Sequence, residues 1–409
     1  MKKLITLAAV LLCTVMIMCA FTACNNTTPP VDEQPDATQN GEATNEDKTS
    51  EAEPFDLSGI DLEQVTYFVP QGEQTGYIDN NGEKVVPEYV LKINGVPVTI
   101  EEYRYPYLNI KASLDGGDDA LWTEEAAEEN RLTEEDIASL KDEVLSYFKQ
   151  TTAYQLMAVK FNLPLTEEEK DEIATSVQQT IDSMNVEGST YTYEQALEDS
   201  FFTDALYRYT MSLYSIANKI FNHLYFDEGA PLGYTPDEML QAVKDAGYIR
   251  TQQLLVKFPD APTEGTDEEK AAAVEAGKAA AKAEAEEVLA KINNGEDFMK
   301  MVEEYNDDPG MDVYGEDGYY FVAGTMVPEY EEASFALEEG AVSGIVETSY
   351  GYHIIKRMPL EADYIVENAQ QYMSEIYSAD FTERLEATFD AMEVEYAPEY
   401  ELISPTTLK

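Results

Sequence analysis

Few side chains in this sequence could carry out chemistry. It contains only two histidines, His223 and His353, and its three cysteines all lie at or before Cys24. A zinc site or a cysteine–histidine nucleophile needs a richer set, so we expect neither. The remaining candidates are His353, in the run Gly-Tyr-His-Ile-Ile, and the carboxylates of Asn-Asp-Asp-Pro at 306–309. An imidazole can donate and accept hydrogen bonds and can change its charge near neutral pH.

The acidic residues near this second motif do not form a convincing metal site. Asp307, Asp308 and Asp312 lack the number of ligands and the glycine position of a calcium-binding loop. The sequence also has no glycine-rich loop of the kind that cradles phosphate groups. We therefore expect no bound metal and no cofactor.

Both motifs belong to a longer series between residues 295 and 358. In chain order the series contains Gly-Glu-Asp-Phe at 295–298, Asn-Asp-Asp-Pro at 306–309, Met-Val-Pro-Glu-Tyr at 326–330, Ala-Ser-Phe-Ala-Leu at 333–337 and Gly-Tyr-His-Ile-Ile at 351–355. In order and spacing it resembles the parvulin family of peptidyl-prolyl isomerases, over nearly the whole catalytic core. The resemblance implies an α/β domain with a four-stranded antiparallel sheet and surrounding helices.

Such enzymes catalyse rotation about the bond before a proline, which faces a barrier of ~18–20 kcal/mol because amide resonance must be lost. No bond is broken, so catalysis needs an apolar pocket for the proline ring, hydrogen-bonding groups and little water. The resemblance assigns Met326, Tyr330 and Phe335 to the pocket, with Tyr350 as a further substrate-binding residue. His353 corresponds to the second family histidine.

Asp308 corresponds to the Cys or Asp that lies between the two family histidines, but two other positions depart from the pattern. The first histidine belongs to a strand that usually reads His-Ile-Leu-Val; here residues 250–256 read Arg-Thr-Gln-Gln-Leu-Leu-Val, so Gln253 replaces it. Glutamine exchanges hydrogen bonds but cannot change charge. Residues 317–321 read Asp-Gly-Tyr-Tyr-Phe instead of Asp-Leu-Gly-Tyr-Phe, so one pocket wall loses its leucine. The expected catalytic set is His353, Asp308 and Gln253.

Three functions fit these residues. The first is an extracytoplasmic foldase with isomerase activity, acting on unfolded or partly folded secreted polypeptides. The second, motivated by Gln253, is a non-catalytic holdase whose parvulin-like domain only binds peptides. The third is an envelope scaffold whose acidic surface keeps it soluble or collects cations. Phosphorylated substrates are not expected, because residues 257–270 lack the basic cluster of phosphate-directed parvulins. His353 and the apolar residues also suit an ordinary core.

The N-terminus indicates export. Lys2 and Lys3 precede an apolar run from Leu4 to Phe21, as in a signal peptide. The run ends in Phe-Thr-Ala-Cys, which resembles a bacterial lipobox with Cys24 as the lipidated residue; a plain secretory signal cut near Ala23 is the alternative. We expect a lipid anchor at the extracytoplasmic face of the cell membrane and no other membrane contact. Because no cysteine follows Cys24, it has no disulfide partner within the exported chain.

The composition is strongly acidic. The net charge is −55, and removal of residues 1–23 leaves 24 basic against 81 acidic residues, a net charge of −57. Such a chain does not bind nucleic acid through phosphate neutralisation. The expected partners are therefore polypeptides, with a homodimer left open.

The predicted fold class is α+β. Beyond the parvulin-like part, the sequence resembles PrsA-like and SurA-like foldases, in which a helical chaperone domain is completed by a returning C-terminal helix. The predicted organisation is a signal peptide at 1–23, a disordered tether at 24–55, a small β-hairpin region at 56–87, the helical chaperone domain at 88–246, the inserted parvulin-like domain at 247–360, the returning helix at 361–397 and a tail at 398–409.

Local signals predict where the helices begin. Capping patterns at Thr99, Thr133, Thr166 and Thr266 each open a helical segment. Further helices are predicted at 193–226, 236–245 and 361–392, and a strand at 248–258. The aromatic and methionine residues of 193–226 either fill the core or line a groove for unfolded chains.

Overall fold

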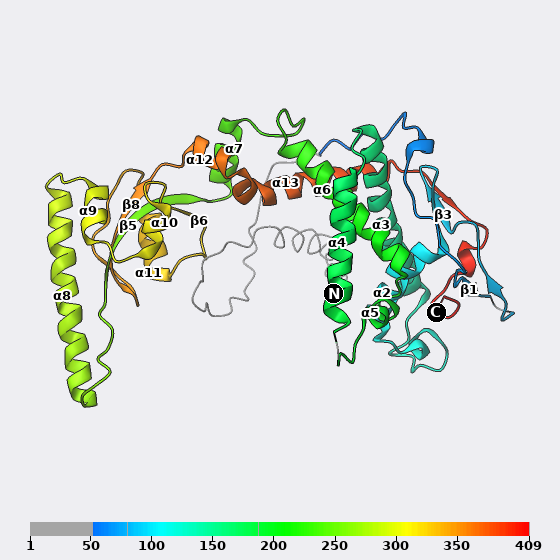
Figure 1. Ribbon diagram of the computed structural model, residues 1–409, viewed down its shortest axis with the longest axis horizontal. Coiled ribbons are helices and arrows are strands. Elements are labelled where there is room, and N and C mark those ends of the chain that lie inside the picture. Colours follow the sequence, from blue (N-terminus) through cyan, green and yellow to red (C-terminus); the bar gives the residue numbers. More distant parts are fainter. Residues whose placement is uncertain (1–51, 80, 187, 409) are drawn as a thin grey trace. The chain divides into compact units, whose positions relative to one another are not determined.

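The computed structural model describes residues 52–79, 81–186 and 188–408 (Figure 1). The predicted signal peptide, Cys24 and nearly all of the predicted tether lie outside the described residues, as does Asn80 of the predicted hairpin turn. The described residues form two compact units. The first combines the residues up to Pro231 with those from Ala379 onward, and the second runs from Leu232 to Ser378.

The second unit contains a four-stranded antiparallel sheet, as the resemblance implied. Its strands follow the order β6-β5-β8-β7, and every neighbouring pair is antiparallel. The elements of this unit are α7 (Pro236–Asp245), β5 (Ile249–Lys257), α8 (Asp267–Asn293), α9 (Phe298–Tyr305), α10 (Pro309–Tyr314), β6 (Tyr319–Phe321), α11 (Pro328–Ala336), β7 (Val346–Glu347), β8 (Gly351–Met358), α12 (Ala362–Glu367) and the first part of α13 (Ala369–Asp390). The predicted α+β fold with a parvulin-like sheet is confirmed.

Strand β5 is one of the two inner strands, and all of its residues except the last are buried. Side chains alternate between the two faces of a strand, so β5 supplies two different cores. Leu254 and Val256 pack with α8 and α9, in a cluster that includes Val288 and Phe298. Ile249 packs on the other face with the neighbouring strands and α11. Odd-numbered residues of β5 therefore face α11.

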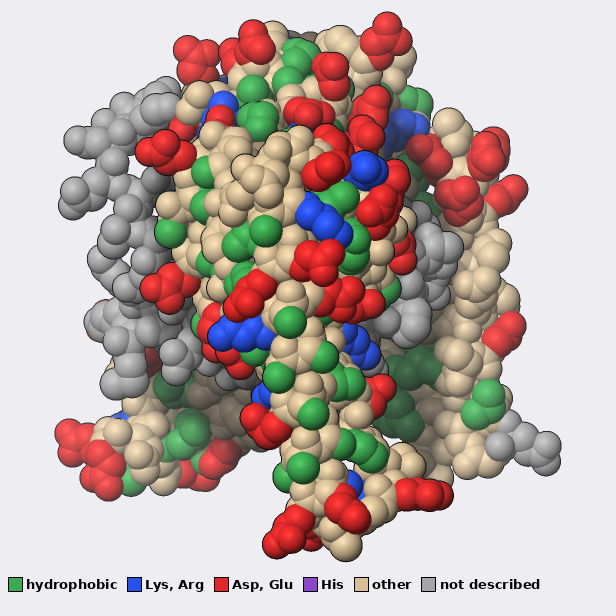
Figure 2. Space-filling view, turned by 90° about the vertical axis from the view of Figure 1, so that its left-hand side faces the viewer, with side chains coloured by type: hydrophobic (Ala, Val, Ile, Leu, Met, Phe, Trp, Pro, Cys, Tyr) green, Lys and Arg blue, Asp and Glu red, His purple; other side chains and the backbone are tan. Residues whose placement is uncertain are grey.

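Helix α8 is the longest element of the second unit. It begins at a capping box between Thr266 and Glu269, as predicted, and its buried residues, Ala281, Ala285 and Val288, all lie in its C-terminal half. The N-terminal half extends beyond the sheet (Figure 1). Figure 2 shows this end of the molecule, where red acidic side chains are spread over the visible surface with fewer blue basic ones, in keeping with the net charge.

The first unit is mainly helical. Its helices are α2 (Ile100–Asp115), α3 (Glu134–Lys160), α4 (Glu167–Met184), α5 (Tyr193–Asp199) and α6 (Asp204–Tyr225), with short 3-10 helices η1 (Leu62–Gln64), η2 (Asp119–Trp122) and η3 (Tyr400–Leu402). Helix α3 packs against both α2 and α6, and α4 packs against α6. The described helices nowhere combine the length and the apolar character that a bilayer-crossing segment requires.

Two small sheets complete the first unit. Strands β1 (Tyr77–Ile78) and β2 (Lys84–Val85) form a hairpin. Strand β3 (Leu91–Ile93) pairs with β4 (Val96–Val98) on one side and with β9 (Val394–Tyr396) on the other, in the order β4-β3-β9. The C-terminal residues are therefore integral to this unit: β9 completes the sheet, and Leu408 is fully buried.

The predicted helix at 193–226 is two helices in the structure. The chain turns at Phe201, which has a φ of 60°, and α6 restarts with Thr203 as its N-cap. The aromatic residues here are buried or half-buried and pack against other rings: Phe221 contacts Phe381, and Tyr105 stacks on Phe202 with centroids 3.9 Å apart. This packing favours the core interpretation over a groove.

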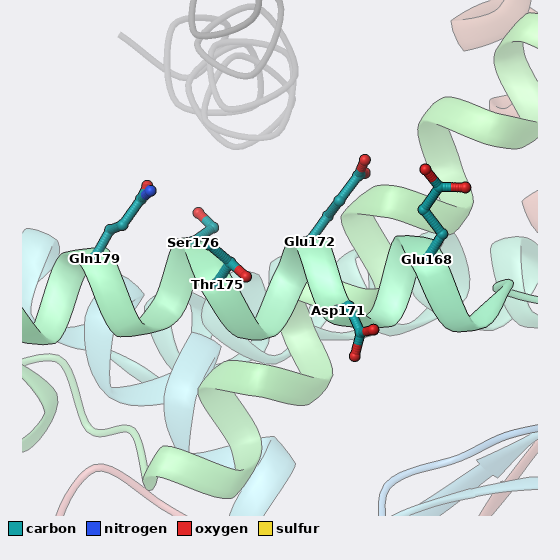
Figure 3. Close-up of a pocket in the computed structure, with 6 residues that line it drawn as sticks. All are labelled: Glu168, Asp171, Glu172, Thr175, Ser176 and Gln179. Atoms are coloured by element: carbon teal, nitrogen blue, oxygen red, sulfur yellow. The ribbon is translucent and has the colours of Figure 1, made fainter.

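An open hollow lies along α4 in the first unit (Figure 3). It is lined by Glu168, Asp171, Glu172, Thr175, Ser176 and Gln179. All six side chains come from one helix, and no second described element supplies a converging group. We do not consider this acidic surface a binding site.

Candidate active site

The candidate site lies on the face of the sheet that is covered by α11. The register pairs Leu255 with His353 and Gln253 with Ile355. Directly paired residues point to the same face of a sheet, so Gln253 and His353 are diagonal neighbours on this face. Both are buried, with 8% and 4% of their surface exposed.

Asp308 reaches the same place from the start of α10, held by the two residues before it. Asn306 Oδ1 accepts from the backbone of Leu255 at 2.9 Å, and Asp307 N donates to the Leu255 carbonyl at 2.8 Å. This pairing fixes the motif along β5. Asp308 is the N-cap of α10, where its Oδ1 accepts from Gly310 N at 3.1 Å. Its other carboxylate oxygen, Oδ2, accepts hydrogen bonds from residues of the site.

The three predicted catalytic residues form a continuous chain of hydrogen bonds. Gln253 Nε2 donates to Asp308 Oδ2 at 2.6 Å, and Gln253 Oε1 lies 2.6 Å from His353 Nδ1. Gln253 thus bridges the imidazole and the carboxylate. The chain continues past His353, because His353 Nε2 lies 2.8 Å from Thr348 Oγ1.

The Asp308 carboxylate gives this chain its direction through the Gln253 amide. A carboxylate only accepts, so Gln253 must turn its NH₂ group to Asp308 and its oxygen to His353. His353 Nδ1 must then carry a proton, which leaves Nε2 as the acceptor for the Thr348 hydroxyl. Thr348 Oγ1 in turn accepts from Tyr350 N at 3.1 Å. Each donor in the chain has one acceptor.

His353 is neutral under ordinary conditions. Burial lowers the pKa of the imidazole to about 4, and the negative charge of Asp308 offsets only part of this effect. The ring of Tyr330 lies edge-on to the imidazole, with centroids 5.4 Å apart, and closes one side of it. A neutral, enclosed imidazole is suited to holding a hydrogen-bond geometry rather than to carrying charge.

The predicted pocket residues surround an apolar cluster next to this chain. Tyr330 is buried and packs with Ile249, Phe321 and Ile355, and Met326 lies against the same cluster. The loop that carries Met326 is held by the Glu331 carboxylate, which accepts from the backbone N–H groups of residues 324–326.

Phe335 and Tyr350 lie at the edge of the site. Phe335 is 40% exposed and contacts Phe321 edge-on, with centroids 6.0 Å apart. Tyr350 is 58% exposed, and its side chain points into no described cluster; its backbone binds Thr348. The structure therefore brings Met326, Tyr330 and Phe335 around one apolar cluster and leaves Tyr350 on the surface beside it.

Comparison with known proteins identifies this unit. Residues 254–359 match the family model for the PPIC-type PPIase domain, also called rotamase; the match begins directly after Gln253. This segment of the chain is therefore similar to PPIC-type peptidyl-prolyl isomerase domains. The resemblance to parvulins is thereby confirmed for this part of the chain, and the PPIase domain includes His353 and Asp308 but not the glutamine that joins them.

Curated relatives of the PPIase domain are foldases. The chain is 53% identical to the foldase protein PrsA of Geobacillus kaustophilus over 72 residues, which are 18% of this chain and 26% of that protein. It is 38% identical to PrsA of Halalkalibacterium halodurans over 146 residues, covering 30% of this chain and 44% of the relative. The chain thus spans about a quarter of the first relative and less than half of the second.

The solved structures that are similar include the crystal structure of PrsA from Bacillus subtilis. It aligns with a TM-score of 0.24 and 21% identity, covering 64% of this chain and 89% of that chain.

Two residues of the site, Thr348 and Tyr319, were not predicted from the sequence. Thr348 lies five residues before His353 within the motif series, and that fixed spacing was the available signal. Tyr319 occupies the position of the family glycine, and its hydroxyl donates to Asp308 Oδ2 at 2.6 Å. Compared with the family pattern, this segment lacks a leucine, and we drew attention to that loss. The residue that contacts the site is instead the additional tyrosine, Tyr319. No group of three or more potential metal ligands occurs among the described residues.

Proposed function

We propose that this chain is an extracytoplasmic foldase that catalyses cis-trans isomerisation of prolyl peptide bonds, with His353, Asp308 and Gln253 as the polar residues of the site. The observation that supports it most is the continuous hydrogen-bond chain next to an apolar cluster inside a PPIC-type PPIase domain. This arrangement contains the two components the reaction requires, an apolar surface for the proline ring and preorganised polar groups beside it.

In this proposal the proline ring lies against Met326, Tyr330 and Phe335, which exclude water from the amide. Rotation removes amide resonance, so the carbonyl becomes more like a ketone and the nitrogen more basic. Because His353 is neutral and both ring nitrogens are already committed, it does not transfer a proton. It holds Thr348 and the surrounding dipoles in place, so that they need little reorganisation as the amide twists.

A protease-coupled assay on the full chain without its signal peptide tests the activity, using a peptide with a single proline. We expect measurable turnover that falls by at least about tenfold in His353→Ala, because that change removes a group hydrogen-bonded on both sides. Tyr396→Phe on β9, in the first unit, is the matched control and should keep wild-type turnover. If the wild type does not accelerate isomerisation, the proposed activity is refuted.

The second candidate is a non-catalytic holdase, and Gln253 is the observation that favours it. Gln253→His separates the two. A large gain from a near-zero baseline identifies the wild type as a holdase, whereas appreciable wild-type turnover that is lost in His353→Ala identifies an enzyme. Suppression of aggregation of an unfolded client protein by the same samples measures holding independently of catalysis.

We further propose that the substrates are unfolded or partly folded secreted polypeptides and that the protein is anchored by a lipid at Cys24; a homodimer is left open. The relatives are named foldases, which supports the first of these proposals. The lipobox-like segment supports the second. Mass spectrometry of the protein purified from membranes tests the anchor with Cys24→Ser as control, and light scattering of the lipid-free form tests the dimer.

A further inference from the structure

Tyr319 reaches the site from β6. Its hydroxyl donates to Asp308 Oδ2 at 2.6 Å, the same oxygen that accepts from Gln253 Nε2 at 2.6 Å. Burial, and then the nearby Asp308 carboxylate, raise the pKa of the phenol far above its usual value, so the group stays neutral. Towards a carboxylate a neutral phenol can only donate. Two donors therefore converge on one oxygen of Asp308.

The space for this hydroxyl depends on Gly310. A Cβ atom at that position would lie 1.9 Å from Tyr319 Oη. Gly310 N also donates to the other carboxylate oxygen of Asp308, at 3.1 Å. The first turn of α10 thus orients Asp308 and at the same time leaves room for the phenol.

The hydrogen-bond chain has one alternative arrangement, in which every bond runs the other way. Asp308 would carry a proton on Oδ2 and donate it to the oxygen of a flipped Gln253 amide. The amide NH₂ would then donate to His353 Nδ1, and His353 Nε2 would donate to Thr348. This arrangement needs a proton on Oδ2 in the direction of Gln253, and Oδ2 would then be a weaker acceptor for the Tyr319 hydroxyl than a carboxylate oxygen is.

We propose that Tyr319 is a positioning residue that sets the direction of this chain. Because its hydrogen bond to a carboxylate is stronger than one to a protonated carboxyl oxygen, Tyr319 favours Asp308 as an acceptor, and Gln253 then presents its oxygen to His353. The imidazole is then held with its proton on Nδ1 and with an unprotonated Nε2 facing Thr348. This inference rests on the proposed function for its kinetic consequence, but the position of the proton can be measured without turnover.

The measurement is the tautomer of His353 in the full chain, by long-range ¹H–¹⁵N NMR after selective labelling of histidine. The chain has only two histidines, and His223→Asn assigns the signals. We expect the Nδ1–H form in the wild type from pH 5 to pH 8. In Tyr319→Phe we expect the Nε2–H form to appear and to grow as the pH falls, because the reversed chain holds one more proton.

The groups that face Asp308 do not themselves change charge in the pH range of this NMR measurement. They are the phenols of Tyr319 and Tyr330, the amide of Gln253 and the imidazole of His353. Burial raises the pKa of both phenols and lowers that of the imidazole to about 4, so none of these neighbours changes charge between pH 5 and pH 8.

Tyr320→Phe is the matched control, because it removes the same atom from the next residue of β6. The Tyr320 ring lies on the opposite face, stacked on Tyr364 with centroids 4.5 Å apart. We expect the control to keep the wild-type tautomer. For Tyr319→Phe we expect kcat to fall about tenfold while KM changes less than about twofold, as for a lost hydrogen bond to a charged group that does not touch substrate.

The tautomer of His353 measured by NMR supports or overturns the positioning role of Tyr319. An Nε2–H form in the wild type overturns the proposal even if Tyr319→Phe fails to fold. A tautomer that is unchanged in folded Tyr319→Phe also overturns it, whatever happens to kcat. A tautomer change in Tyr319→Phe alone, in a protein without measurable isomerisation, supports the positioning role and refutes the proposed activity instead.

Discussion

Gln253 bridges His353 and Asp308 through the two ends of a single amide, with both contacts at 2.6 Å. A histidine in this position would be able to move a proton between its two nitrogens, whereas an amide has a fixed donor end and a fixed acceptor end. The substitution therefore keeps the connection between the two residues and removes the group that titrates. The consequences for pH dependence can be tested.

Isomerase activity should be insensitive to mild acid. Because burial lowers the pKa of His353 to about 4, the imidazole stays neutral between pH 5.5 and pH 8, and kcat/KM should be flat over this range. Gln253→His introduces a second imidazole and should restore a titration near neutral pH. A wild-type profile that falls with an apparent pKa near 6.5 would contradict this prediction.

The same pKa predicts a stability effect of His353. The imidazole has a pKa of 6.5 in the unfolded chain and about 4 in the folded protein. Between these values only the unfolded chain takes up the proton, so the free energy of unfolding is highest above pH 6.5 and decreases by up to a few kcal/mol as the pH falls to 4. His353→Gln should remove this part of the pH dependence in urea denaturation of the second unit. An unchanged slope would refute it.

Glu102 should destabilise the first unit at alkaline pH. Its carboxylate belongs to the capping box of α2 and accepts from Thr99 N at 2.9 Å, but it is buried, and burial raises its pKa from 4.5 to about 8. The folded protein therefore holds a proton that the unfolded chain has lost, and stability decreases as the pH rises from 4.5 through 8. Glu102→Gln should flatten the dependence of the urea midpoint on pH between 6 and 9.

Glu238 provides the control for Glu102. It has the same role in the capping box of α7, with Thr235, but it is exposed, and hydrogen bonds from Thr235 lower its pKa. Its contribution is therefore constant above pH 4.5 and is lost only in acid. Glu238→Gln should leave the dependence between pH 6 and pH 9 unchanged; an equal effect of both substitutions would show that burial is not the cause.

Arg250 should not be replaceable by lysine. Its buried guanidinium donates to the carbonyls of Asp317 at 2.6 Å and Glu316 at 2.8 Å, and it pairs with Glu361. A lysine cannot reproduce this fork, so in Arg250→Lys the Asp317 carbonyl and the Glu361 carboxylate lose guanidinium donors, whereas Glu316 keeps the donor from Gln252. The substitution should lower the free energy of unfolding by about 2 kcal/mol. The exposed pair Arg208–Asp204 is the comparison: Arg208→Lys should cost less than about 0.5 kcal/mol. Similar losses would contradict the role of the fork.

Gly310 and Tyr319 should be energetically coupled. Gly310→Ala places a Cβ 1.9 Å from Tyr319 Oη, so the phenol must leave Asp308, and both stability and turnover should fall. In a Tyr319→Gly background the same change meets no phenol and should cost less, by at least about 1 kcal/mol in a double-mutant cycle. Gly344→Ala, where the added atom would meet nothing within 4 Å, should be neutral. Additive costs would refute the coupling.

Much of the fold could be predicted because local signals were strong. The capping patterns at Thr99, Thr133, Thr166 and Thr266 each precede a helix in the structure. Where the prediction was wrong, the apolar pattern continued across a break. The helix predicted at 361–392 is two helices, α12 and α13, with Asn368 as the C-cap of the first. Periodicity alone does not register a single residue that leaves helical geometry.

The candidate site could be predicted only in part. The motif series and its resemblance to parvulins were sufficient to predict that His353 and Asp308 lie close together and that Gln253 takes the place of the first family histidine. The position of the Tyr319 hydroxyl was not predictable from either signal. It depends on the close approach that Gly310 allows between α10 and β6, and such an approach has no period or motif in the sequence.

The pairing of β3 with β9 has a consequence for the order in which the protein folds. Leu91 pairs with Tyr396, so the first unit cannot complete its sheet until nearly the whole chain is present. The second unit, by contrast, is a compact unit that is continuous in sequence, from Leu232 to Ser378. In a chain delivered N-terminus first, the second unit can acquire its structure before the last strand of the first unit is present. A protein proposed to assist the folding of others would then have its own prolyl isomerase ready before its own folding is finished.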